Sequence, residues 1–149
     1  MERTHRISAG AIIIQDNKML LVKYHEKGRT YLVCPGGGVN SEEGLPQAAI
    51  REVKEEAGLD VRVQKILFIE DLYGEHYRVT KVWFLCAVTG GILERTQGAI
   101  DEKIKDVKWY NRKELDDFTV YPPPIKETAW EEFVNSGWKV QYLDIRQAD

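Results

Sequence analysis

The segment that decides the fold is residues 37–59, GGVNSEEGLPQAAIREVKEEAGL, in a chain of 149 residues. Its second half predicts a helix, because Pro46 suits a first helical position, residues 48–57 are rich in helix formers, and Gly58 suits the position just past the end. Leu45 would then be the N-cap, where it is a poor choice, so the start is predicted to within about two residues. The glycines before the helix predict a loop.

Three glutamates share one face of this predicted helix. At about 100° per residue, Glu52, Glu55 and Glu56 fall within roughly a quarter-turn. Like charges at these spacings cost about 0.2–0.5 kcal/mol per pair, of which Arg51 offsets only part. A bound hard divalent cation turns this repulsion between the glutamates into a net attraction, because carboxylate oxygens are its preferred ligands. Glu43, in the preceding loop, can add a fourth carboxylate.

The loop before the helix contains Gly36, Gly37 and Gly38 in succession. Successive glycines permit positive φ and remove side chains, so a ligand can approach the backbone closely. Carbonyls there could join a metal shell, and N–H groups could face phosphate oxygens. Together with the glutamates, this loop favours attack of water on phosphorus, assisted by a cation and by a carboxylate that accepts the proton.

The same residues resemble the Nudix box, the signature of the Nudix hydrolases. Its defining positions are all filled here, with apolar Val53 and Leu59 beside them: Gly37, Glu43, Arg51, Glu52, Glu55, Glu56 and Gly58. The resemblance implies a Nudix fold, an α/β (α+β) class with a mixed β-sheet between helices. It implies one Nudix hydrolase domain over residues 1–149.

The resemblance also implies roles for the matched residues. Glu55 and Glu56 would be the principal ligands of Mg²⁺ or Mn²⁺, and Glu52 would be a further ligand or the catalytic base. Arg51 would orient the glutamates by hydrogen bonds, so that Arg51, Glu52 and Glu55 are the predicted catalytic group. The backbone carbonyl of Gly37 is a further candidate ligand.

Residues outside the box complete the predicted site. Many family members use one more acidic ligand before a late tryptophan-bearing strand; here Glu102 is the candidate and Asp101 the alternate. Phosphate contacts are predicted from the glycines Gly36, Gly37 and Gly38 and from three cations: Lys23, Arg29 and Arg78. An aromatic side chain could stack on a base, and the sequence does not choose among Tyr24, Tyr31, Tyr73 and Trp83.

The remaining pattern predicts a sheet and one more helix. Apolar, β-branched and aromatic runs indicate strands over residues 9–14, 19–24, 31–34, 61–69, 77–88 and 105–110. A long loop is expected from Gly90. A helix is expected near residues 125–136, with one apolar face formed by Ile125, Ala129, Trp130 and Phe133.

Composition limits the partners. The formal charge is −3, so no polybasic surface is forced and long nucleic acid is not an expected partner. No apolar run approaches the roughly 18 residues of a membrane span and no signal peptide is evident, so a cytoplasmic location without a membrane partner is expected. The two cysteines, Cys34 and Cys86, are expected to be reduced core thiols. A homodimer is left open.

The predicted activity is metal-dependent hydrolysis of a diphosphate bond in a nucleoside diphosphate linked to another moiety. A nucleoside triphosphate, as in the MutT branch, a nucleotide sugar and ADP-ribose all stay open as substrates. Some ADP-ribose-cleaving members carry a proline beyond the box, and here no proline lies between Pro46 and Pro122. Alternatives from other classes are a catalytically weak Nudix-like domain that binds a nucleotide and regulates a partner, and an enzyme that processes RNA ends.

Overall fold

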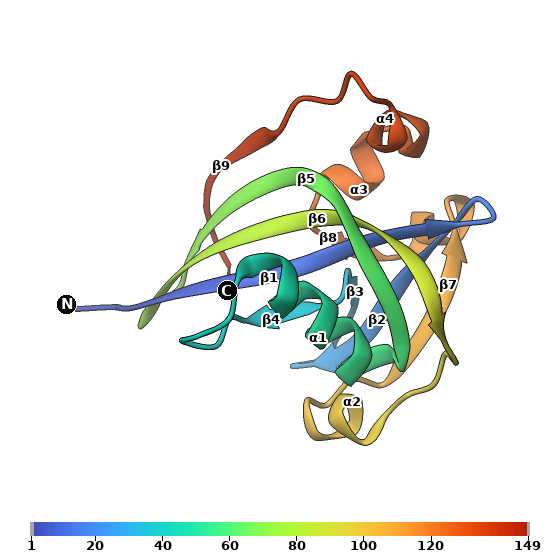
Figure 1. Ribbon diagram of the computed structural model, residues 1–149. Coiled ribbons are helices and arrows are strands. Elements are labelled where there is room, and N and C mark those ends of the chain that lie inside the picture. The colour runs from blue at the N-terminus through green and yellow to red at the C-terminus, as the bar shows by residue number, and fades with distance from the viewer. Residues whose placement is uncertain (1, 149) are drawn as a thin grey trace.

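The strand-forming runs combine into one mixed sheet in the computed structural model, which describes residues 2–148 (Figure 1). The strand order is β8-β3-β2-β1-β6-β5-β9, with β4 added beside β1 and β7 beside β2. The strands are β1 (Thr4–Gln15), β2 (Lys18–Glu26), β3 (Arg29–Val33), β4 (Gly36–Gly38), β5 (Leu59–Tyr73), β6 (Tyr77–Gly91), β7 (Asp106–Asn111), β8 (Thr119–Tyr121) and β9 (Gln141–Gln147).

The centre of the sheet is a long parallel pair, β1 with β6, flanked by the antiparallel pair β5–β6. Parallel neighbours need a crossover between them, and α1 (Leu45–Ala57) lies within the connection from β1 to β6. The other helical segments are short: α2 (Gln97–Asp101), the 3₁₀ turn η1 (Lys113–Asp117), α3 (Pro124–Glu127) and α4 (Trp130–Val134).

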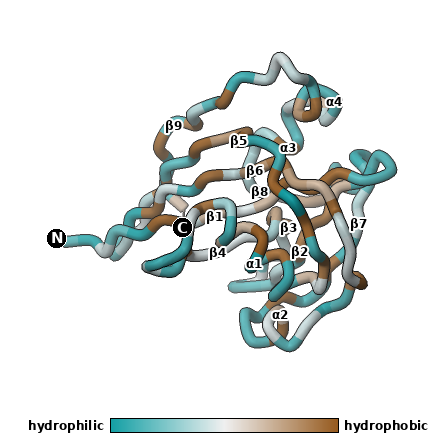
Figure 2. The backbone as a smooth tube through the Cα atoms, viewed as in Figure 1, coloured by the Kyte–Doolittle hydropathy of each residue, from teal (hydrophilic) through white to brown (hydrophobic). Residues whose placement is uncertain are grey.

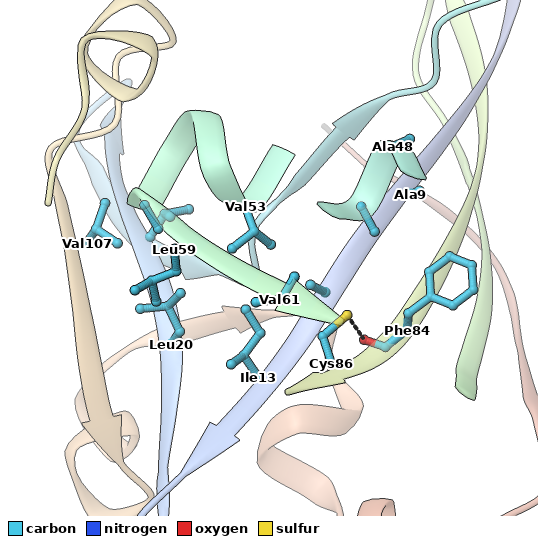
Figure 3. Close-up of a cluster of buried hydrophobic side chains, with 14 of the residues drawn as sticks. Ala9, Ile13, Leu20, Ala48, Val53, Leu59, Val61, Phe84, Cys86 and Val107 are labelled. Atoms are coloured by element: carbon cyan, nitrogen blue, oxygen red, sulfur yellow. Dashed lines mark hydrogen bonds between the residues drawn. The ribbon is translucent and has the colours of Figure 1, made fainter. Parts of the chain in front are cut away.

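Two apolar cores lie on opposite faces of the sheet. On one face, α1 buries Ala49, Val53 and Ala57 against Ala11 and Ile13 of β1, as the close-up in Figure 3 shows around Val53 and Ile13. On the other face, α3 and α4 bring Ile125, Trp130 and Phe133 against Phe68 and Trp83 of the sheet. Figure 2 shows the apolar residues concentrated along the middle of the strands, with polar turns outside them. The predicted mixed sheet between helices is therefore confirmed.

The box helix begins and ends close to the predicted positions. Its N-cap is Gly44 rather than Leu45, and Pro46 occupies the first turn. Gly58 ends it at φ 76°, in the left-handed region, and donates its N–H to the Lys54 carbonyl at 3.0 Å.

The prediction of a loop at Gly36, Gly37 and Gly38 was wrong. These residues form β4, paired with Ser8, Ala9 and Gly10 of β1, and none of them has a positive φ. What the segment requires is the absence of side chains: a Cβ on Gly36 would lie 2.7 Å from the Gly10 Cα atom. Close packing of two backbones, and not left-handed geometry, explains these glycines.

The predicted helix at residues 125–136 is two short helices, α3 and α4. Thr128 and Ala129 between them are extended, at φ −116° and −64° with ψ 139° and 130°. Arg112 accounts for the interruption, because its guanidinium donates to the carbonyls of Lys126, at 2.8 Å, and of Thr128. Carbonyls engaged in this way are withdrawn from a continuous helical ladder.

The C-terminal half holds further differences from the prediction. β6 continues through Gly90 to Gly91, and the expected long loop contains α2. β8 and β9 were not predicted. Both cysteines are buried and unpaired among the described residues, in agreement with the sequence. No helix within residues 2–148 has both the length and the apolar character needed to cross a membrane.

Candidate metal and substrate site

A cluster of three carboxylates lies at the surface of α1. Oxygen atoms of Glu52, Glu55 and Glu102 all come within 4.8 Å of one another. Glu52 and Glu55 are one turn apart on the helix, and Glu102 arrives from the end of α2. The Thr96 hydroxyl donates to the Glu55 carbonyl, and thus fixes α2 against α1. Burial, together with the nearby charges of Glu52 and Glu55, raises the pKa of Glu102.

Arg51 ties this cluster to the loop before the helix. Its Nε and one terminal nitrogen bond both oxygens of Glu43, at 2.7 and 2.8 Å. The same guanidinium donates to Glu52 at 3.0 Å, to Glu55 at 3.2 Å and to the Gly38 carbonyl at 2.9 Å. The hydrogen bonds from Arg51 lower the pKa of Glu43 to about 2. Glu43 therefore lies in the site as the anchor of Arg51.

Two of the glutamates are buried with incompletely bonded oxygens. Glu52 is 5% exposed and Glu56 is 1% exposed. Within residues 2–148, Oε2 of each has no hydrogen-bond partner. Burial, a hydrogen bond with Glu52 and the charge of Glu52 raise the pKa of Glu56 well above its usual value. Unpartnered buried carboxylate oxygens are the donors that a hard divalent cation takes, so these residues fit such an ion.

Gly37 faces the Glu52 carboxylate directly. A Cβ at this position would lie 2.5 Å from Oε1 of Glu52. Any side chain at residue 37 would therefore displace the carboxylate. The missing side chain lets the β4 backbone reach the acidic cluster, which places the Gly37 peptide next to the candidate ligands.

A pocket of about 650 Å³ opens beside β4 and reaches Glu56. Along one wall the rings of Tyr24 and Tyr31 stack, with centroids 5.5 Å apart and planes at 20°. The lining also includes charged residues of β5, β6 and β9, among them Glu70, Lys81 and Arg146. The pocket thus combines an aromatic surface, a carboxylate edge and a charged wall.

Comparison with known proteins decides the family. The model of the NUDIX domain matches residues 4–130. The chain belongs to the Nudix family. It is 27% identical to Nudix hydrolase 2 of Arabidopsis thaliana over 96% of this chain and 46% of that protein. It is 33% identical to an 8-oxo-dGDP phosphatase of Danio rerio over 87% of this chain and 37% of that protein.

A solved structure shares the fold as well. The crystal structure of an ADP-ribose pyrophosphatase from Streptococcus suis superposes with a TM-score of 0.63 at 26% identity, over 92% of this chain and 98% of that one. The chain spans less than half the length of the two curated relatives above. Their activities therefore describe those longer proteins.

The structure brings together the acidic residues expected from the Nudix box. Glu52, Glu55 and Glu56 lie on α1 together with Arg51, and Glu52 faces Gly37. Glu102, chosen from outside the box, lies in the cluster, whereas the alternate Asp101 accepts a hydrogen bond from Gln97 at 2.9 Å.

The predicted phosphate-binding cations are dispersed. Arg29 lines the pocket, with its guanidinium 5.4 Å from the centroid of the Tyr31 ring. Lys23 lies over the Phe118 ring at 5.5 Å and is not among the residues that line the pocket. Arg78 pairs with Asp71 at 3.3 Å and lines a separate hollow. The structure thus brings only Arg29, and the glycines of β4, to the Nudix site.

Several pocket residues were absent from the sequence-based set of site residues. Lys81 and Ser8 carry no motif, although each lies in a strand where alternation could place it on one face. Arg146 arrives on β9 through parallel pairing with β5, for which no local pattern exists. Tyr24 and Tyr31 line the pocket, as does the largely buried Trp83, whereas Tyr73 lines the separate hollow.

Proposed function

We propose that the chain is a divalent-metal-dependent hydrolase of a diphosphate bond in a nucleoside diphosphate linked to another moiety. The observation that carries the proposal is the carboxylate group on α1 and α2, in which buried oxygens of Glu52 and Glu56 lack protein partners. The Nudix membership supports the reaction class. The activities named for two similar proteins, an 8-oxo-dGDP phosphatase and an ADP-ribose pyrophosphatase, support a diphosphate bond as the bond that is cleaved.

The metal would be held by carboxylates from two elements. Glu52, Glu55 and Glu102 would supply the nearest oxygens, with Glu56 and the Gly37 carbonyl as further ligands. Bound Mg²⁺ or Mn²⁺ supplies charge neutralisation at phosphate oxygens and a lower pKa for water.

The protein side chains position the reaction. Arg51 holds the carboxylates of Glu52 and Glu55 together, so both keep their orientation as substrate enters. One of these two carboxylates accepts the proton of the attacking water. Because Glu55 is 46% exposed while Glu52 is 6% exposed at the side chain, the two offer a solvent-facing and a buried acceptor. The water attacks phosphorus with inversion, and the diphosphate bridge breaks into two phosphate-bearing products.

The pocket supports a nucleotide-sized substrate. Its volume of about 650 Å³ lies within the roughly 300–1,000 Å³ typical of small-molecule sites. Tyr24 and Tyr31 provide a flat aromatic wall on which a base can stack. A nucleoside triphosphate, a nucleotide sugar and ADP-ribose all fit this description. A single domain over residues 1–149, a cytoplasmic location and the oligomeric state stay predictions.

The test is a substrate screen with a matched pair of variants. Nucleoside triphosphates, nucleotide sugars and ADP-ribose are incubated with Mg²⁺ or Mn²⁺, and phosphate is measured after phosphatase coupling. We expect turnover in the wild type and a loss of about 10²–10⁴-fold in Glu55→Gln. Glu42→Gln is the control, since Glu42 is an exposed acid of the same region. Retained turnover in Glu55→Gln would contradict the assignment.

The screen also discriminates the regulatory alternative. A nucleotide-binding module without catalysis would bind members of the panel in calorimetry and release no phosphate from any of them. The carboxylate cluster favours the enzyme, because the acids Glu52, Glu55 and Glu56 of the box are all present on one helix.

A further inference from the structure

One row of residues crosses the sheet at the edge of the pocket. Glu70 of β5 pairs with Lys81 of β6, Lys81 pairs with Ser8 of β1, and Ser8 pairs with Gly38 of β4. Paired residues in register face the same side of a sheet, and all four line the pocket. Lys81 therefore stands between the Glu70 wall and the glycine strand that reaches the carboxylate cluster.

Lys81 has no close counter-ion among the described residues. Its ammonium lies 5.3 Å from the centroid of the Trp83 ring, and no carboxylate within residues 2–148 forms an ion pair with it. Glu70 is already bonded: Trp83 Nε1 donates to one oxygen and Arg146 to the other, each at 3.0 Å. Burial lowers the pKa of Lys81, and the more distant charges of Glu70 and Glu56 counteract this only in part.

A partly buried ammonium without a counter-ion is stabilised when an anionic ligand binds beside it. Its free N–H donors face a pocket that is also lined by Ser8, a residue only 8% exposed. A neutral acceptor would leave the positive charge uncompensated, whereas an oxyanion both accepts the hydrogen bonds and neutralises the charge. Arg6 and Arg146 line the same pocket and add positive charge.

We propose that Lys81, assisted by Ser8, binds a phosphate oxygen of the substrate. This subsite rests on the proposed function, because its ligand is the substrate diphosphate. Lys81 and Glu56 line the same pocket, so a diphosphate lying in it can direct one phosphate to the glutamates and the next to Lys81. Lys81 then selects substrates whose anionic group extends past the cleaved bond.

The test compares two lysines that each lie over the ring of the aromatic residue two positions further along the chain. Lys81→Met removes the proposed contact, and Lys108→Met is the control. The Lys108 ammonium lies 4.8 Å from the ring centroid of Tyr110, which follows two residues later in the strand, just as Trp83 follows Lys81. Unlike Lys81, Lys108 forms an ion pair with Glu114 and lies outside the pocket. Binding of inorganic pyrophosphate is measured by titration calorimetry, once with EDTA and once with Mg²⁺.

We expect Lys81→Met to bind pyrophosphate about tenfold or more weaker than wild type, the loss that follows when a charged hydrogen bond is removed. Lys108→Met should match the wild type, and Ser8→Ala, measured as an independent variant, should bind a few-fold weaker. Thermal melting verifies that each variant is folded. Equal affinities of wild type and Lys81→Met under both conditions would overturn the subsite, as would an absence of binding by the wild type under both.

These binding measurements need no turnover, which separates the two proposals. Retained hydrolysis in Glu55→Gln, combined with weak pyrophosphate binding in Lys81→Met, would reject the catalytic assignment and keep the subsite. Loss of hydrolysis in Glu55→Gln, combined with unchanged pyrophosphate binding in Lys81→Met, would keep the catalytic assignment and reject the subsite.

Discussion

An alanine at position 37 should disable the site while leaving the chain folded. A Cβ on Gly37 would lie 2.5 Å from Oε1, 2.6 Å from Cδ and 2.8 Å from Oε2 of Glu52. Ordinary contact begins at 3.4 Å, so the nearest oxygen has to move from 2.5 to 3.4 Å, a withdrawal of about 0.9 Å. Glu52 cannot yield freely, because it is buried and Arg51 holds Oε1 at 3.0 Å.

A displacement of about 1 Å at a reacting group costs on the order of a hundredfold in rate, equivalent to about 2.7 kcal/mol. We therefore expect kcat/KM of Gly37→Ala to fall by about that factor, measured as Mg²⁺-dependent phosphate release from the best substrate of the screen. Gly90→Ala is the matched control, because Gly90 lies outside the pocket, a Cβ there meets its nearest atom only at 3.4 Å, and neither glycine has a positive φ. A Gly37→Ala enzyme within about threefold of wild type would refute the reasoning.

Two further predictions concern Arg51 and the buried acids. Arg51→Lys should lower the free energy of unfolding by about 1–3 kcal/mol in urea melts, because lysine cannot bond both oxygens of Glu43, whereas the exposed Arg62→Lys should leave it unchanged. In EDTA, the free energy of unfolding should fall as the pH rises above the ordinary carboxyl pKa of about 4.3, because native Glu56, with its raised pKa, retains a proton that the unfolded chain has lost. Mg²⁺ should flatten this slope, and stability that rises with pH in EDTA would contradict the assignment.

The box helix was predictable because its determinants are local. Pro46, the helix formers after it and Gly58 specify a start, a body and an end within one short segment. Helical spacing then places Glu52 and Glu55 one turn apart wherever the helix packs. The central strands were predictable for a similar reason, since their apolar runs are long and rich in β-branched residues.

The glycine strand shows where local reasoning fails. Three glycines in succession are typical of a loop, yet β4 pairs with β1. The decisive contacts are with the Gly10 backbone and the Glu52 carboxylate, which are distant in the sequence and become neighbours only in the folded chain.

The sequence alone determined the carboxylate-bearing helix, because a helix is specified by hydrogen bonds between near neighbours and by a period of about 3.6 residues in the sequence. Only tertiary structure decided which distant groups surround that helix. Glu102 reaches Glu52 and Glu55 because α2 docks on α1. Lys81 enters the pocket through the register of β6 with β1, and Arg146 enters it through the pairing of the largely exposed strand β9 with β5. Such pairings depend on long-range contacts and loop closure, which leave no periodic signal in the sequence.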